Sequence, residues 1–130
     1  MDLKTIELSE LVKMAEAGEV LAELELGNRF YYGEGGAELD LEKAVFWYGK
    51  SAEKECAEAQ CLLGYCLREG IGTDADYEKA FALFEKAAEQ GFAMAQYNLG
   101  LAFEKGLGVG SDSEKAQEWF ALAKENGYTE

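Results

Sequence analysis

Residues 22–27 read Ala-Glu-Leu-Glu-Leu-Gly, and the pattern returns as Ala-Gln-Cys-Leu-Leu-Gly at 59–64 and as Ala-Gln-Tyr-Asn-Leu-Gly at 95–100. The second copy starts 37 residues after the first, and the third starts 36 residues after the second. Self-similarity at a period of about 20 to 50 residues is typical of repeat architectures, in which each unit stacks on its neighbours. This spacing decides the fold class.

The first half of each copy has the periodicity of an amphipathic helix. Ala22, Leu26 and Phe30 fall at i, i+4 and i+8, which places them on one apolar stripe. A glycine follows each leucine, although glycine inside a helix costs about 1 kcal/mol relative to alanine. We therefore expect another helix to approach closely at these glycines, which are Gly27, Gly64 and Gly100.

A Gly-x-Gly element closes each first half. Its first glycine is expected to end the helix in the left-handed conformation, where a Cβ atom would clash. These glycines are Gly33, Gly70 and Gly106. Each second half then begins with an aspartate, whose carboxylate can accept a hydrogen bond from a free amide at the start of a helix. The predicted N-caps are Asp40, Asp76 and Asp112.

The second half of each copy is also helical in pattern. Ala80, Leu83, Phe84 and Ala87 recur at i, i+3, i+4 and i+7, so this face is predicted to pack on the preceding helix. Each copy is then a helix-turn-helix unit. The larger side chains expected in the core are Leu26, Phe30, Tyr48, Leu63, Leu67, Phe84, Leu99, Phe103 and Phe120.

The residues before the first copy predict an unpaired helix. Leu11, Met14 and Ala15 lie on one side of a segment from Ser9 to Ala17, and Gly18 follows it. The ends of a stacked array need such capping elements. We predict an all-α solenoid of seven helices in a single domain, divided into a cap at 1–18 and repeats at 19–55, 56–91 and 92–128 within residues 1–130.

The charge of the chain limits the classes of partner. It has 130 residues with 26 acidic and 12 basic side chains, which gives a formal charge of −14. That charge repels the phosphates of nucleic acids and anionic membranes and favours basic segments of other proteins. The alternative is that the acidic excess only keeps the protein in solution. No apolar run approaches the roughly 20 residues that cross a bilayer, and no secretory signal is evident, so the expected location is the cytoplasm.

No residue pattern indicates catalysis, a cofactor or a metal. Histidine is absent, which excludes Ser-His-Asp and Cys-His catalysis and histidine-based zinc sites. Cys56, Cys61 and Cys66 are odd in number, and their spacing of five scatters them around a helix. We expect reduced thiols and neither a disulfide framework nor a metal site. The Gly-x-Gly loops lack the Lys-Ser/Thr ending of a phosphate-binding loop.

The full pattern reads Ala-x-x-x-Leu-Gly-x-x-Phe-x-x-Gly-x-Gly and then Asp-x-x-Lys-Ala-x-x-Trp-Tyr/Phe. Over residues 22–128 it resembles the Sel1-like repeat, a relative of the tetratricopeptide repeat. The resemblance implies a superhelix of stacked helical hairpins that binds other proteins and has no enzymatic activity. Two departures occur: an extra residue at Gly36 or Ala37, and Leu122 and Lys124 where the first copy has Lys50 and Ala52.

The resemblance also implies a binding surface on the inner, concave face of the first helices. The positions beside the apolar stripe also include Cys61, Glu69 and Glu104. The predicted binding residues are Leu24, Asn28, Tyr31, Tyr32, Tyr65, Arg68, Tyr97, Leu101 and Lys105. Tyrosine is common at interfaces because it buries a large area at low entropic cost. The alternative is that these tyrosines fill gaps between repeats and that Arg68 is a surface salt-bridge partner.

Two alternative functions remain open. The protein could associate with itself, as a structural component, through its exposed end faces, such as that of its last helix, or through the concave strip. The second, more remote alternative is β-lactam binding, which is associated with some cysteine-rich secreted relatives of this family. Those relatives carry paired cysteines in each repeat, and this chain lacks such pairs.

Overall fold

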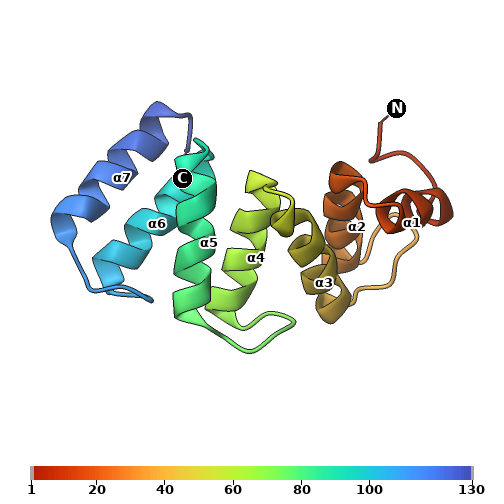
Figure 1. Ribbon diagram of the computed structural model, residues 1–130, viewed down its shortest axis with the longest axis horizontal. Coiled ribbons are helices and arrows are strands. Elements are labelled where there is room, and N and C mark those ends of the chain that lie inside the picture. Colours follow the sequence, from red (N-terminus) through yellow and green to blue (C-terminus); the bar gives the residue numbers. More distant parts are fainter. Residues whose placement is uncertain (1, 130) are drawn as a thin grey trace.

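The structure is a computed structural model that describes residues 2–129, so the outermost positions of the expected 1–130 domain, residues 1 and 130, lie outside the described part. Seven helices and no strand occur in that part. They are α1 (Leu8–Glu16), α2 (Val20–Tyr32), α3 (Leu41–Glu53), α4 (Ala57–Glu69), α5 (Tyr77–Glu89), α6 (Ala93–Lys105) and α7 (Ser113–Glu125). Figure 1 shows them side by side in chain order, which confirms the predicted all-α solenoid.

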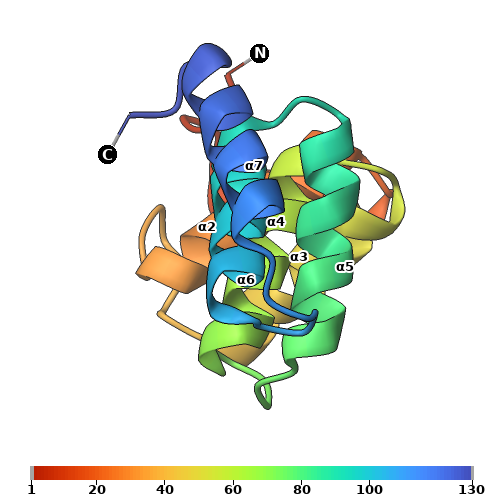
Figure 2. The ribbon, with the colours of Figure 1, turned by 90° about the vertical axis from the view of Figure 1, so that its left-hand side faces the viewer.

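The helices pack as three hairpins behind one unpaired helix. We call α2, α4 and α6 the A helices and α3, α5 and α7 the B helices. Each A helix packs on the B helix of its own hairpin, and α3 and α5 also pack on the next A helix. The helix α1 packs on α2, with Leu11 and Ala15 buried against Ala22 and Leu26. Figure 2 views the row of helices from the end opposite α1, where α7 lies nearest the viewer.

The mid-helix glycines lie where a ring of the B helix touches the A helix, as predicted. A Cβ atom on Gly27 would lie 2.7 Å from the Tyr48 ring. The corresponding distances are 2.9 Å from Gly64 to Phe84 and 2.6 Å from Gly100 to Phe120. Such distances are shorter than van der Waals contact, so only glycine lets the two helices approach this closely.

The structure confirms the predicted ends of the A helices and the predicted starts of the B helices. Gly33, Gly70 and Gly106 end the A helices with φ values of 65°, 70° and 68°. The Oδ1 atoms of the three capping aspartates accept hydrogen bonds from backbone amides at 3.0 to 3.1 Å, in the pairs Asp40 with Lys43, Asp76 with Lys79 and Asp112 with Lys115. The second glycine of the later loops has a separate role: a Cβ atom on Gly72 or Gly108 would collide with a carbonyl at the start of the preceding B helix.

The core repeats with the hairpins. Leu24, Tyr48 and Ala52 of the first hairpin cluster with Ala59 and Cys66 of α4. One repeat later, residues at the equivalent positions cluster with the start of α6, namely Cys61, Phe84 and Ala88 with Ala95. Of the predicted core side chains, Leu26, Tyr48, Phe84, Leu99 and Phe103 are buried, whereas Phe30, Leu63, Leu67 and Phe120 are partly exposed.

A polar contact also repeats where the B helices end. Gln60 donates to the Ala52 carbonyl at 3.4 Å and accepts from Gln90 at 2.9 Å. Gln96 likewise donates to the Ala88 carbonyl at 3.1 Å and accepts from Asn126 at 2.9 Å. Each glutamine therefore links two successive B helices.

The first hairpin has a charged version of this contact. Glu23 takes the glutamine position and its Oε2 accepts from Lys54 Nζ at 2.6 Å. A carboxylate cannot donate to a carbonyl in the way that a glutamine amide can. Glu23 Oε1 is accordingly the one buried polar side-chain atom in the described residues that lacks a hydrogen-bond partner.

A buried arginine holds the segment before α1. Arg29 is almost fully buried, and its Nη2 donates to the carbonyls of Leu3 and Ile6, both at 2.8 Å. Its Nε donates to Glu25 Oε2 at 3.1 Å and its Nη1 to the Gly35 carbonyl at 3.2 Å. The segment before α1 is thereby attached to the first hairpin by charge-assisted hydrogen bonds, which are stronger than neutral ones.

The glycine contacts predict opposite effects of the same substitution at two sites. Gly27→Ala should lower the free energy of unfolding by about 1 to 2 kcal/mol, because Tyr48 is buried and cannot yield without strain. Gly49→Ala should raise it by up to about 1 kcal/mol, because nothing lies within 4 Å of the added Cβ atom and alanine is the better helix former. Urea denaturation measures both, and an equal effect at the two positions would contradict the close contact.

Arg29→Ala should lower the free energy of unfolding by about 3 kcal/mol, since it leaves the Glu25 carboxylate and several carbonyls without their donor. Hydrogen exchange should then become faster at residues 3–7 before it does in α6. Lys13→Ala, which removes an exposed cation of α1, is the matched control and should change neither quantity. Unchanged exchange at residues 3–7 in the arginine variant would show that other contacts hold this segment.

Candidate binding surface

Two of the nine predicted binding residues serve the first hairpin itself. Leu24 is 8% exposed and packs in the core cluster with Tyr48 and Ala59. Asn28 accepts a 2.7 Å hydrogen bond from the Tyr48 hydroxyl at its Oδ1. Leu24 therefore offers little surface to a partner, because α4 covers it, and Asn28 is only partly exposed.

The end of α2 presents one partly buried and one open tyrosine. The Tyr31 and Tyr32 rings meet edge to face with centroids 4.9 Å apart, and Tyr31 also faces the Tyr48 ring at 6.3 Å. Burial, followed by the proximity of Cys66, raises the pKa of Tyr31. Tyr32 is 61% exposed. Tyr31 therefore fills space between repeats, whereas Tyr32 is accessible.

Arg68 is held in place at the end of α4. Its guanidinium carbon lies 5.2 Å from the Tyr65 ring centroid and 5.7 Å from that of Phe84. Nη1 donates to Asn98 Oδ1 at 2.8 Å, and Nε donates to Glu69 Oε2 at 2.9 Å. The side chain thus joins α4 to α6 and is presented in a defined orientation. Tyr65, at its edge, is 37% exposed.

A shallow pocket of about 280 Å³ connects α4 with α6. Predicted residues from both A helices line it, namely Arg68 with its neighbour Glu69, and Leu101 with Lys105. Tyr77, which is 49% exposed, and Leu107 complete the wall. The sequence patterns did not select these two, because Tyr77 is the first residue of a B helix and Leu107 lies inside a Gly-x-Gly loop.

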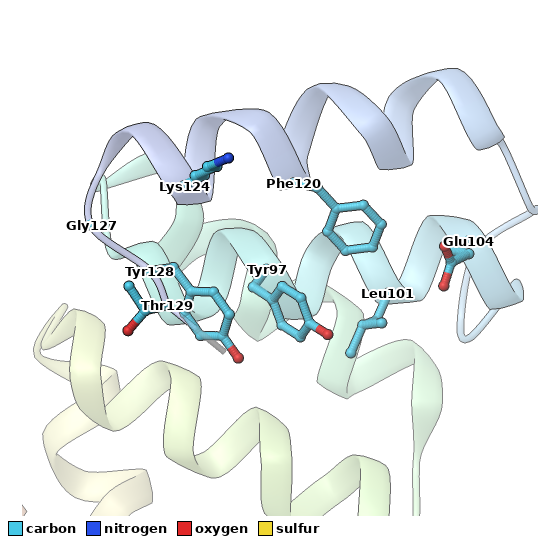
Figure 3. Close-up of a pocket in the computed structure, with 8 residues that line it drawn as sticks. All are labelled: Tyr97, Leu101, Glu104, Phe120, Lys124, Gly127, Tyr128 and Thr129. Carbon is cyan, nitrogen blue, oxygen red and sulfur yellow. The ribbon is translucent and has the colours of Figure 1, made fainter.

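A larger groove of about 840 Å³ lies along α6 and α7. We call it the terminal groove, and Figure 3 shows its side chains: Tyr97, Leu101 and Glu104 of α6, Phe120 and Lys124 of α7, and Tyr128 beyond α7. The Tyr97 ring stacks on Tyr128 at 4.4 Å between centroids and tilts against Phe120 at 5.3 Å. Tyr97 and Leu101 were predicted as binding residues, whereas Phe120 had been assigned to the core.

Two of the three thiols are buried and poorly reactive. All three cysteines are unpaired, and Cys61 and Cys66 are buried. Burial raises the pKa of Cys61 to about 12, against the smaller lowering effects of the Asn98 amide and Arg68, and it raises the pKa of Cys66 to about 11. Protonated, inaccessible thiols are poor nucleophiles and poor metal ligands. Within residues 2–129, no group of acidic or cysteine side chains is arranged to hold a metal ion.

None of the described helices has the length and apolar character required to cross a membrane.

The sequence profile of the Sel1 repeat matches residues 20–56, 57–92 and 93–128, which together cover most of the chain. The chain belongs to the Sel1 repeat family. A search among curated proteins finds no match.

Solved Sel1 repeat structures have the same fold. A Sel1 repeat protein from Oxalobacter formigenes is 37% identical, with a TM-score of 0.82 over 93% of this chain and 90% of the other. A protective antigen of uropathogenic Escherichia coli is 31% identical with a TM-score of 0.70, and its match covers 95% of this chain but only 34% of the antigen. The cysteine-rich protein B of Helicobacter pylori, at 22% identity and a TM-score of 0.71 over 92% of this chain and 90% of the other, shares the fold.

Sel1 repeats generally serve as scaffolds for protein–protein interaction and are typically without enzymatic activity.

The burial of the thiols predicts selective labelling. At about pH 8, iodoacetamide should modify the half-buried Cys56 in the native protein, and Cys61 and Cys66 only after denaturation. Mass spectrometry of peptides from native and denatured samples identifies the labelled residues. Rapid native labelling of Cys61 would contradict its burial.

The same shifts predict a loss of stability in alkali. The folded pKa values of Cys61 and Cys66 lie above the ordinary value of 9.0, so their contribution is complete below about pH 9 and is lost as the pH rises towards 11 to 12. In thermal melts, the variant with Cys61→Ala and Cys66→Ala should lose less stability over this interval than the natural sequence. An equal loss of thermal stability in the variant and the natural sequence would show that groups other than these two thiols cause it.

Proposed function

We propose that this Sel1 repeat protein is a non-enzymatic adaptor that binds a segment of another protein along its A helices. The binding strip consists of Tyr32, Tyr65, Arg68, Tyr97, Leu101 and Lys105. The observation that carries the proposal is the state of these side chains: Tyr32 and Tyr65 are open to solvent, and Arg68 is held beside Tyr65 by Asn98 in the wall of the pocket between α4 and α6.

Preorganisation supports this assignment. Arg68 is already ordered by Tyr65, Asn98 and Glu69, so little side-chain entropy remains to be lost when a partner binds. Tyrosine and arginine are the side chains that most often dominate binding energy at protein interfaces. The pocket between Arg68 and Lys105 offers a recess for one side chain of the partner.

The charge of the chain supports a partner with a basic character. A net charge of −14 accelerates encounter with basic segments, while Arg68 and Lys105 supply two local cations for a carboxylate within the bound segment. The unpaired thiols of Cys61 and Cys66 support a reducing compartment such as the cytoplasm.

A phage-displayed library of random linear peptides tests the strip. Selection on the immobilised protein should enrich a family of related peptides, and the double variant Tyr32→Ala with Tyr65→Ala should bind them at least about tenfold more weakly. Both side chains are exposed, so the variant should remain folded, which its circular dichroism and melting temperature verify.

Phe46→Ala is the matched control, because it removes an equally exposed aromatic side chain from the B helix α3. It should leave affinity within about twofold. Peptides that bind the double variant as well as the natural protein would refute a role for the strip, and so would peptides that depend on Phe46 instead.

A further inference from the structure

The internal repetition shows what kind of element fits the terminal groove. In the first hairpin, Leu24, Tyr48 and Ala52 cluster with α4, and in the second, Cys61, Phe84 and Ala88 cluster with residues of α6. The next residues in this series are Tyr97, Phe120 and Lys124. All three line the terminal groove, so the groove is the surface that an A helix covers in the two earlier repeats.

We propose that the terminal groove binds one amphipathic α-helix of a partner protein, packed as α4 packs on the first hairpin and as α6 packs on the second. The proposal rests on the adaptor function proposed above and deepens it, because it names the conformation and the chemistry of one bound segment.

The equivalent interfaces define the apolar side of this helix. The A helices that occupy them bury small residues seven positions apart, Ala59 with Cys66 in α4 and Ala95 with Ala102 in α6. These positions lie on one face, two turns apart. A partner helix therefore needs small side chains at i and i+7 to approach Phe120 as closely as α4 approaches Tyr48.

Lys124 determines the charge at one end of the groove. It takes the place of Ala52 and Ala88, whose carbonyls accept hydrogen bonds from the first turns of α4 and α6. The Lys124 side chain therefore faces the first turn of a bound helix. A cation beside the positive N-terminal end of a helix is unfavourable unless acidic side chains lie there. The bound helix should begin with Asp or Glu.

Glu104 defines the other end. It takes the position of Tyr31 and Arg68, which lie near the ends of α2 and α4. A basic residue in the last turn of the partner helix would pair with Glu104 and with the negative end of the helix dipole. The helix α4 already has this arrangement, with Glu58 in its first turn and Arg68 in its last.

A second copy of this chain is less suited to the groove. Its A helices already pack between neighbouring helices, and α1 buries Leu11 and Ala15 against α2. A second copy could supply an A helix only by opening one of its hairpins. Lys124 in the groove also differs from the uncharged Ala52 and Ala88 at the equivalent positions of the internal junctions.

The probe is a synthetic peptide with the sequence of residues 56–70 carrying Cys56→Ser, Cys61→Ala and Cys66→Ala, bridged on its outer face at i and i+4. The bridge is needed because an isolated helix of this length is only marginally stable in water. Fluorescence anisotropy with the full chain should show saturable binding below about 1 mM, with one peptide per protein.

Charge reversal locates the site. Lys124→Glu should weaken binding about tenfold, and a peptide carrying Glu58→Lys should recover most of that loss on the Lys124→Glu protein but bind poorly to the natural one. Lys86→Glu makes the same charge change on α5, away from the groove, and should alter affinity less than twofold.

Absence of binding, or binding that is indifferent to Lys124, overturns the proposal. A natural protein that dimerises in sedimentation and becomes monomeric with Lys124→Glu also overturns it, in favour of a second copy as the occupant. The strip experiment uses Tyr32 and Tyr65, which lie outside the groove, so failure of the helix proposal leaves the result for the strip unaffected.

Discussion

The contact between a glycine of the A helix and an aromatic ring of the B helix determines the geometry of every hairpin in this protein. Because Gly27, Gly64 and Gly100 have no side chain, the rings of Tyr48, Phe84 and Phe120 lie directly on the helix backbone. Each ring then supports a residue of the outer surface: Tyr31 beside Tyr48, Arg68 over Phe84 and Tyr97 against Phe120. The binding surface is thus built on the same contacts that close the hairpins.

Much of the fold could be predicted because local chemistry repeats three times. Apolar stripes at helical spacing, capping aspartates and left-handed glycines are properties of short segments. Each could be predicted without knowledge of the neighbouring units. The Arg29 network and the glutamine links could not be predicted in this way. The bonds from Arg29 to the segment before α1 and those that the glutamines accept span 23 to 30 residues, and a single arginine or glutamine has no periodic pattern.

The candidate site was predictable only in part. The side of an A helix that faces a partner in one repeat is covered by the next helix in another, so equivalent positions differ in exposure. Leu24 and Cys61 are buried under a following helix, whereas Tyr97 at the same position lies in the terminal groove. Tyr77 and Leu107 line the surface pocket from a B helix and a loop. The sequence prediction considered only positions on the A helices and therefore did not include them.

The polar links between helices make the first hairpin different from the two that follow it. Glu23 pairs with Lys54, whereas Gln60 and Gln96 pair with neutral amides and also donate to a preceding helix. A first hairpin moved to an internal place would set the Glu23 carboxylate against a carbonyl oxygen. Recombination between repeats that moved the first unit to an internal place would create this mismatch, so selection on buried hydrogen bonds can preserve its place at the start of the array.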